Sequence, residues 1–258
     1  MSIVLTGDYH THTPYSHGEN TVEENVVRAK ELGLKEVGIT DHGISHVAFG
    51  LRRKKINAYI AECRAAQEKH GIKVLVGLEA NIRGKSGKCD LTEKEYEFFD
   101  LYLCGKHTFI WYDTFGDMCR YGVGNLFSDK RSDCKKLIDY NTKAYIAAIR
   151  NNPIDAVTHL NYRCPCDTLE VAKCAADHGT YLELNSKKQH LSDEQLGEIF
   201  VKTDVRFIIN SDAHSAQRVG DTALVDEQLS RLQFPMERID NVNGRTPNFR
   251  FTAYKQQK

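Results

Sequence analysis

The sequence predicts a parallel α/β fold in the form of a closed or nearly closed barrel. Apolar, β-branched runs of strand length alternate with helical patterns along the chain. Seven such strand-then-helix units favour parallel strands with helices packed outside them. The length of 258 residues suits one barrel better than an open sheet. Because no linker or internal repeat interrupts the pattern, we expect a single domain over residues 1–258.

Each expected strand is a short run, rich in apolar and β-branched residues, that precedes a helical pattern. In chain order the seven runs are Ile3–Thr6, Glu36–Thr40, Lys73–Leu78, Leu101–Gly105, Ala156–Thr158, Tyr181–Leu184 and Arg206–Ile209.

The expected helices carry start and stop signals. Thr21 and Glu24 have capping-box spacing at the start of the first helix, and Gly33 follows its end. Glycines also follow the second and fourth helices, at Gly71 and Gly179. The other five expected helices are Arg52–His70, Cys134–Asn151, Asp167–His178, Ser192–Lys202 and Asp221–Leu232.

Two segments stand apart from this alternation. His107–Asp133 follows the fourth strand and is rich in aromatic residues and glycine. A long loop in this position is expected to shape a site rather than to fill a core. The last stretch, Pro235–Lys258, is a basic, polar tail that we expect to be partly ordered.

Composition narrows the class of function and the compartment. The formal net charge is zero, so no global field favours nucleic acid or an anionic membrane. The sequence shows neither an apolar run long enough to cross a bilayer nor the pattern of a secretion signal, so we expect a cytoplasmic protein without a membrane partner. The eight cysteines have no C-x-x-C spacing. We expect them to be free, with Cys164 and Cys166 as metal ligands only a minor alternative.

Histidines and carboxylates recur at the C-terminal ends of the expected strands, the end that carries the chemistry in parallel α/β folds. The first strand is followed by DYHTHT, in which His10 and His12 share one face. Six of the seven strands deliver His, Asp or Glu in this way, which predicts a metal site. The nine candidate ligands are His10, His12, His17, His42, Glu79, His107, His159, Asp212 and His214. We expect His70, His178 and His190 to be structural or solvated, and we leave His46 open.

This arrangement resembles the PHP superfamily, which is named for polymerase and histidinol phosphatase. The matching stretches are D-Y-H-T-H-T, T-D-H-G, G-L-E-A-N, G-K-H, T-H-L-N and S-D-A-H-S, which extend from residue 8 to residue 215. The sequence is most similar to the small stand-alone bacterial PHP phosphatases. The resemblance implies a distorted (β/α)7 barrel that holds three divalent metal ions, most simply zinc, with manganese or iron as alternatives.

The resemblance also implies how the ligands divide among the metals. His10, His12, Glu79 and Asp212 are expected at the first ion. Glu79, His107 and His159 are expected at the second, with Glu79 as a bridge. His17, His42 and His214 are expected at the third. The implied reaction is hydrolysis of a phosphomonoester, in which a hydroxide held by the metals attacks phosphorus.

Further residues are expected to support this chemistry. Asp8 and Asp41 stand beside ligands, and we expect them to orient imidazoles by accepting hydrogen bonds. A small phosphorylated substrate requires cationic side chains near the strand ends. We expect Arg163, Arg218 and Lys187 to provide them.

Three other functions remain open at this stage. The first is histidinol-phosphate phosphatase activity, for which the aromatics, Asp113 and Asp117 of the insert offer a box for a cationic substrate. The second is processing of nucleic-acid ends, which the zero net charge disfavours. The third is a non-catalytic metal-binding module, which we expect to have lost ligands that this chain retains.

Overall fold

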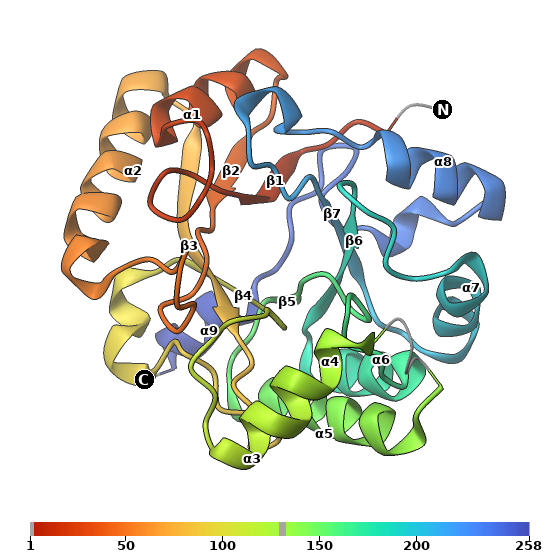
Figure 1. The fold of residues 1–258 in the computed structure, drawn as a ribbon. Coiled ribbons are helices and arrows are strands. Elements are labelled where there is room, and N and C mark those ends of the chain that lie inside the picture. The colour runs from red at the N-terminus through yellow and green to blue at the C-terminus, as the bar shows by residue number, and fades with distance from the viewer. Residues whose placement is uncertain (1–2, 129–132, 258) are drawn as a thin grey trace.

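The computed structural model describes residues 3–128 and 133–257 and shows seven parallel strands in the order β1-β2-β3-β4-β5-β6-β7. The strands form a nearly closed barrel with the helices outside it (Figure 1). Their bounds are β1 Gly7–Thr11, β2 Glu36–Ile39, β3 Lys73–Asn81, β4 Leu101–Gly105, β5 Ala156–Val157, β6 Tyr181–Asn185 and β7 Phe207–Asn210. The predicted fold class is thus confirmed.

The helices form a layer around the strands (Figure 1). The longer ones are α1 Val22–Glu31, α2 Ile56–His70, α5 Lys135–Asn151, α6 Thr168–His178, α7 Asp193–Lys202 and α8 Ala223–Leu232. The C-terminal helix is α9 Arg250–Gln256, and the short helical segments are η1 Arg53–Lys55, η2 Glu93–Phe98, η5 Ala216–Arg218 and η6 Met236–Arg238. The expected helix over 52–70 therefore begins as a 3-10 turn.

The caps observed in the structure agree with the signals in the sequence. Thr21 and Glu24 form a reciprocal capping box at the start of α1. Asp167 caps α6, and Ser192 caps α7 through a box with Gln195. Gly71 and Gly179 end their helices with φ of 66° each, in the left-handed region that favours glycine.

The first strand does not lie where the sequence predicted it. Ile3–Thr6 was expected to be a strand, but β1 begins at Gly7. The earlier residues pair with the C-terminal tail instead, because Leu5 forms an antiparallel bridge with Val242 and the Thr6 amide donates to Asn241 O at 2.8 Å. As a result His10 lies inside the strand rather than after it. The third strand is also longer than expected, so Glu79 lies within β3.

Residues 115–126 of the aromatic insert are helical rather than a loop. Phe115–Asp117 (α3), Met118–Val123 (the π-helical segment η3) and Gly124–Leu126 (α4) follow one another without a break. The last part of the predicted insert, residues 129–132, lies outside the described residues. Tyr121 packs into the core, whereas Trp111 and Phe115 remain exposed.

Candidate metal centre

Glu79 lies at the middle of the candidate metal site. Its carboxylate is fully buried at the end of β3, and each of its oxygens faces different imidazoles. Oε1 lies 2.7 Å from His159 Nε2 and 3.1 Å from His107 Nε2. Oε2 lies 2.8 Å from His42 Nδ1 and 3.3 Å from His10 Nε2. A carboxylate in this position can bridge two cations.

Asp212 forms the second acidic point of the site. Its Oδ1 lies 3.4 Å from His12 Nε2, 3.9 Å from His10 Nε2 and 3.3 Å from His214 Nδ1. Asp212 has a φ of 49°, and His159 has a φ of 69°. Both residues thus adopt a left-handed backbone that non-glycine residues rarely take, and such strain gathers at functional sites.

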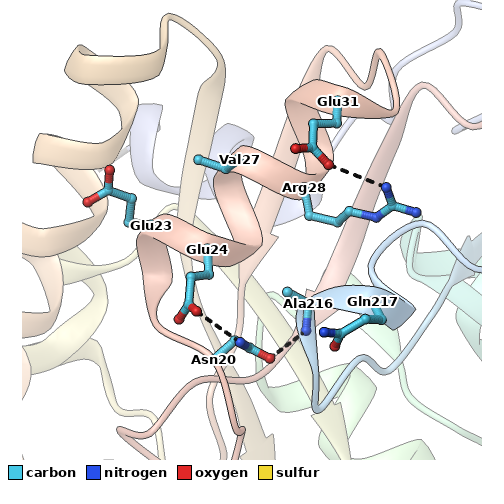
Figure 2. Close-up of a pocket in the computed structure, with 8 residues that line it drawn as sticks. All are labelled: Asn20, Glu23, Glu24, Val27, Arg28, Glu31, Ala216 and Gln217. Atoms are coloured by element: carbon cyan, nitrogen blue, oxygen red, sulfur yellow. Dashed lines mark hydrogen bonds and ion pairs between the residues drawn. The ribbon is translucent and has the colours of Figure 1, made fainter.

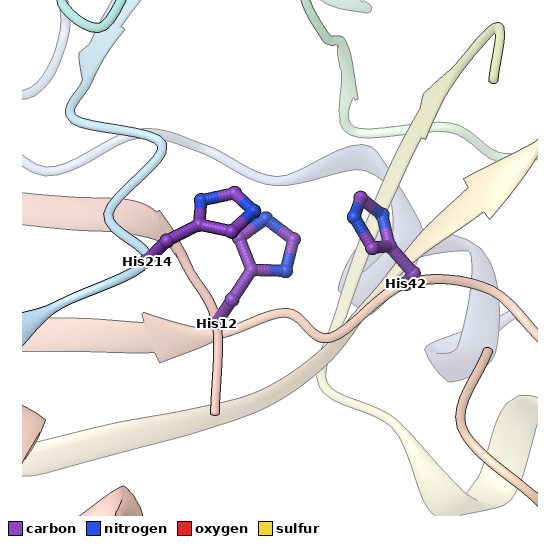
Figure 3. Close-up of side chains that lie close together, drawn as sticks. All are labelled: His12, His42 and His214. Atoms are coloured by element: carbon purple, nitrogen blue, oxygen red, sulfur yellow. The ribbon is translucent and has the colours of Figure 1, made fainter. Parts of the chain in front are cut away.

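The structure brings all nine predicted ligands to one place. Three groups have potential ligand atoms within 4.8 Å of one another: His12, His42 and His214; His10, His12 and Asp212; and His42, Glu79 and His107. Figure 3 shows the first group, with His42 facing His12 and His214. His17 completes the cluster, because its ring centre lies 4.2 Å from that of His214 and 4.8 Å from that of His42.

The protonation states of His12, His42 and Glu79 suit a metal, whereas Glu79 raises the pKa of His10 and His159 despite their burial. Burial, together with the neighbouring His42 and His214, lowers the pKa of His12 well below its usual range. Burial also lowers the pKa of His42 to about 4. Burial alone would raise the pKa of Glu79, but the imidazoles around it hold that pKa well below its ordinary value. Neutral imidazoles and an ionised carboxylate are the forms that bind divalent cations.

Buried polar atoms without a hydrogen-bond partner test whether these residues suit a metal centre. Among the described residues, His10 Nε2, His12 Nε2 and Glu79 Oε2 are buried without a hydrogen-bond partner. An unsatisfied buried polar atom costs about 1–3 kcal/mol. Cations placed between these atoms would satisfy all three, so the residues fit a metal centre.

Two residues that sequence reasoning missed orient the ligands. Glu183 Oε1 lies 2.6 Å from His10 Nδ1, and Asn81 Oδ1 lies 2.7 Å from His107 Nδ1. Each contact fixes the outer ring nitrogen, so that Nε2 faces the centre. The signal for both was strand alternation, because Glu183 and Asn81 are each two residues from another inward-facing polar residue on the same strand.

The hydrogen bonds of Asp8 and Asp41, which we expected to orient imidazoles, go to loop groups. Asp8 accepts hydrogen bonds from the Gly220 amide at 2.8 Å and from Ser211 Oγ at 2.5 Å. Asp41 accepts from the Thr13 amide and hydroxyl and from Ser16 Oγ. Both carboxylates therefore hold the loops that follow the strands.

A cavity of about 300 Å³ opens onto the centre. Seven of the nine predicted ligands line it, together with Tyr162, Lys187, Lys188 and His190. Lys187 Nζ lies 3.3 Å from Asp212 Oδ1 and 2.8 Å from His214 Nδ1. The predicted contact residue Lys187 thus reaches the site. His190, expected to be structural or solvated, also lies in this wall, and its ring centre is 6.0 Å from that of His159.

The two predicted arginine contacts do not line this cavity. Arg218 donates to Ser186 O at 3.2 Å and pairs with Asp221 at 3.0 Å. Arg163 is exposed and lies 5.8 Å from the centre of the Tyr162 ring. Both residues follow strand ends, as the sequence indicated, but their loops direct the guanidinium groups elsewhere.

The insert shapes a neighbouring groove rather than the cavity. Beyond His107, residues 108–115 and several side chains up to residue 126 line an apolar hollow of about 560 Å³ together with Val47. Asp113 pairs with Lys88 at 3.2 Å, and Asp117 accepts from the Lys85 amide at 3.0 Å. Neither carboxylate lines the central cavity, so the expected box for a cationic substrate does not form there. His46 accepts from the Phe49 amide at 3.1 Å and stays beside the centre, its ring 5.4 Å from that of His42.

Another hollow lies on the outer side of α1 (Figure 2). Its polar groups pair with one another, since Asn20 bonds to Glu24 at 3.1 Å and to the Ala216 amide at 2.9 Å, while Arg28 pairs with Glu31. We assign it no chemistry. All eight cysteines are free, including the buried Cys164 and Cys166. No helix within the described residues is long and apolar enough to cross a bilayer.

The model of the PHP domain family matches residues 8–187, the stretch that carries seven of the nine clustered residues. The chain belongs to the PHP domain family. The nearly closed seven-stranded barrel with a histidine-rich rim is therefore the PHP fold in this protein.

Relatives in this family include two bacterial proteins of similar resemblance. "Probable phosphatase PMI1003" of Proteus mirabilis is 30% identical over 183 residues, which are 68% of this chain and 66% of that protein. "Probable phosphatase YcdX" of Escherichia coli O81 is 29% identical over 183 residues, with 68% and 66% covered. The matched part of the chain thus spans slightly under two thirds of these PHP relatives.

A solved PHP structure shows the same fold over nearly the whole chain. Histidinol phosphate phosphatase from Lactococcus lactis, crystallised with zinc, L-histidinol and phosphate, superposes with a TM-score of 0.61 at 16% identity. The match covers 96% of this chain and 100% of the other.

Proposed function

We propose that this protein is a metal-dependent phosphoesterase that hydrolyses phosphomonoesters at a centre of three divalent ions. The observation that carries the proposal is the buried Glu79 carboxylate between two groups of imidazoles, with unpaired atoms at His10, His12 and Glu79 Oε2. The phosphatase names of the PHP relatives point the same way.

In this proposal the ligands keep the division that the resemblance implies. His10, His12, Glu79 and Asp212 would hold the first ion, Glu79, His107 and His159 the second, and His17, His42 and His214 the third. Imidazole and carboxylate ligands suit zinc, and the Lactococcus lactis structure contains zinc; manganese and iron suit the same ligands. Bound divalent ions would neutralise charge on phosphate oxygens and lower the pKa of coordinated water toward neutrality.

The residues of the chain then have distinct tasks. Glu183 and Asn81 keep two imidazoles in the tautomer that presents Nε2 to the centre. Thr158 Oγ1 donates to Glu79 Oε1 at 2.9 Å and so holds the bridging carboxylate in place. Lys187 extends an ammonium group into the cavity, where it can donate to a phosphate oxygen.

Hydrolysis of phenyl phosphate tests the activity. We expect turnover that disappears after chelation and returns with Zn²⁺ or Mn²⁺. Glu79→Gln should lower kcat/KM by about 100-fold or more, because loss of one ligand charge weakens two ions at once. The matched control is Glu198→Gln on the exposed face of α7, which should leave kcat/KM unchanged. Full activity in the chelated wild-type protein would refute the proposal.

Metal content gives a measurement that does not depend on the choice of substrate. Elemental analysis of reconstituted protein should find three divalent ions per chain, and fewer in Glu79→Gln. A content of zero in the wild-type protein, with no gain on reconstitution, would refute the metal centre itself.

Histidinol phosphate is a second candidate substrate, because the Lactococcus lactis structure is named for it. The cavity wall weighs against a cationic substrate, since the only carboxylates among its described lining residues, Glu79 and Asp212, belong to the centre. Comparing kcat/KM for histidinol phosphate and phenyl phosphate decides between the two.

A further inference from the structure

We propose that Tyr162, Lys188 and His190, here called the rim cluster, bind a second anionic group on the substrate. This inference rests on the proposed phosphomonoesterase function and names its substrate class. The preferred substrate is a small phosphomonoester whose alcohol part carries a carboxylate or another phosphate. The rim cluster thereby determines specificity, while the reaction itself takes place at the centre.

The rim cluster is a compact unit beside the centre. The ring centres of Tyr162 and His190 lie 4.8 Å apart, and Lys188 Nζ lies 5.1 Å from the centre of the Tyr162 ring. His190 connects the cluster to the centre through His159, whose Nε2 lies 2.7 Å from Glu79. A phosphoryl group at the centre would thus have the rest of its molecule against this wall.

The two neighbouring lysines differ in what they contact. Asn185 Oδ1 accepts both of their backbone amides, at 2.9 Å from Lys187 and 3.2 Å from Lys188, and this fixes the turn after β6. The ammonium of Lys187 reaches Asp212 and is engaged with the centre. The ammonium of Lys188 lies over an aromatic face instead, and no carboxylate among the described residues forms an ion pair with it.

Charge and size complete the argument. The outer wall presents ammonium, phenol and imidazole groups, all of which can donate a hydrogen bond to an anion, and it contributes no acid of its own. The Lys188 ammonium would repel a cationic substrate, and the described residues of the outer wall include no carboxylate to offset this repulsion. The cavity of about 300 Å³ lies at the small end of ligand sites, which limits the substrate to a small molecule.

Three aryl phosphates of matched shape test the inference: phenyl phosphate, 4-carboxyphenyl phosphate and 4-(aminomethyl)phenyl phosphate. We expect the metal-loaded protein to show a higher kcat/KM for the carboxy compound than for the aminomethyl compound. Lys188→Met should lower that ratio about fivefold or more, which is a charged hydrogen bond discounted for solvent exposure. Comparing this ratio between the variant and the wild-type protein cancels differences in leaving-group chemistry between the two substrates.

The control is Lys143→Met on the exposed face of α5, which removes an exposed lysine that does not line the cavity. It should leave the ratio unchanged. Raising the ionic strength should lower the ratio in the wild-type protein but not in Lys188→Met, because salt screens an exposed ion pair. An unchanged ratio in Lys188→Met, or a wild-type preference for the aminomethyl compound, overturns the inference.

A binding measurement separates this inference from the proposed function. Benzylphosphonate and 4-carboxybenzylphosphonate are not hydrolysed, and calorimetry gives their Kd on metal-loaded protein. We expect tighter binding of the carboxy compound, and loss of that difference in Lys188→Met. Absent hydrolysis of phenyl phosphate refutes the function, whereas equal Kd values for the two phosphonates refute only the rim cluster.

Discussion

At the scale of single residues, the centre depends on which ring nitrogen each histidine presents. Glu183 is the residue that fixes this for His10, and it also accepts from Asn210 Nδ2 at 3.0 Å and Asn185 Nδ2 at 2.9 Å. Because three donors surround the Glu183 carboxylate, an N–H group in its place would face another donor. The Glu183 carboxylate is therefore required both for its negative charge behind His10 and for its ability to accept three hydrogen bonds.

Glu183→Gln should weaken metal binding by about 10- to 100-fold, because the amide places a donor against donors and removes charge from behind His10. Competition with a chromophoric chelator measures the affinity. Glu198→Gln serves as the control, since its carboxylate pairs only at the surface with Lys202. Equal affinity in Glu183→Gln and the wild-type protein would show that Glu183 has no part in orienting His10.

The ligands themselves were predictable from the sequence, whereas their supports were not. His42 and Asp212 follow strand ends and His10 lies inside β1, and in each case residue type and position indicate a ligand. Glu183 lies inside a strand that appeared to supply no ligand, so only the alternation of side chains across β6 pointed to it. The directions of Arg163 and Arg218 depend on loop conformations that a local sequence pattern does not specify.

At the scale of elements, a buried acid helps to hold the C-terminal helix. Asp155 Oδ1 accepts from the Phe251 amide at 2.7 Å, and its Oδ2 accepts from the Tyr102 amide at 2.8 Å. It therefore joins α9 to β4. The sequence predicted only a partly ordered tail, because its hydrogen bonds connect residues about a hundred positions apart.

Asp155 should make stability fall as pH rises. Burial raises the pKa of its carboxyl from the ordinary 3.8 to about 7, despite the amides that lower it. The folded state then holds a proton that the unfolded state has released, so this stabilisation is complete below about pH 4 and is lost as pH rises through 7.

Urea unfolding of the wild-type protein and Asp155→Asn at pH 5, 6, 7 and 8 measures this contribution. The free-energy gap in favour of the wild-type protein should shrink from pH 5 to pH 7 and level off by pH 8, because asparagine does not titrate. Titration of the histidines cancels in the comparison. A gap independent of pH would mean that the Asp155 carboxyl is not protonated in the folded protein.

At the scale of the whole molecule, the barrel has a seam between β1 and β7. Near the rim, the His12 amide donates to Ala213 O at 2.8 Å and the Ala213 amide donates to His10 O at 3.1 Å. Farther from the rim, the side chain of Asn241 provides hydrogen bonds that link the two strands. It donates to Gly7 O at 2.9 Å and to Ile209 O at 2.6 Å, and it accepts from the Ile209 amide at 2.9 Å.

Asn241→Ala should lower the free energy of unfolding by about 2–4 kcal/mol, because three buried hydrogen bonds are lost and their backbone partners stay unpaired. Asn151→Ala, which removes one exposed hydrogen bond to Ser86, should cost less than about 1 kcal/mol. Urea unfolding compares the two. Similar small losses in both variants would show that the seam is held by other contacts.

The position of the centre across this seam has a consequence for how the protein opens. His10 and His12 lie on the β1 side of the seam, and Asp212 and His214 lie on the β7 side. Cations bound between them would therefore link the two edge strands of the barrel. Chelation should then speed amide exchange at His12 and Ala213 more than in β3 or β4, as hydrogen–deuterium exchange with mass spectrometry can measure. The same metal ions would then serve the proposed hydrolysis and keep β1 and β7 together.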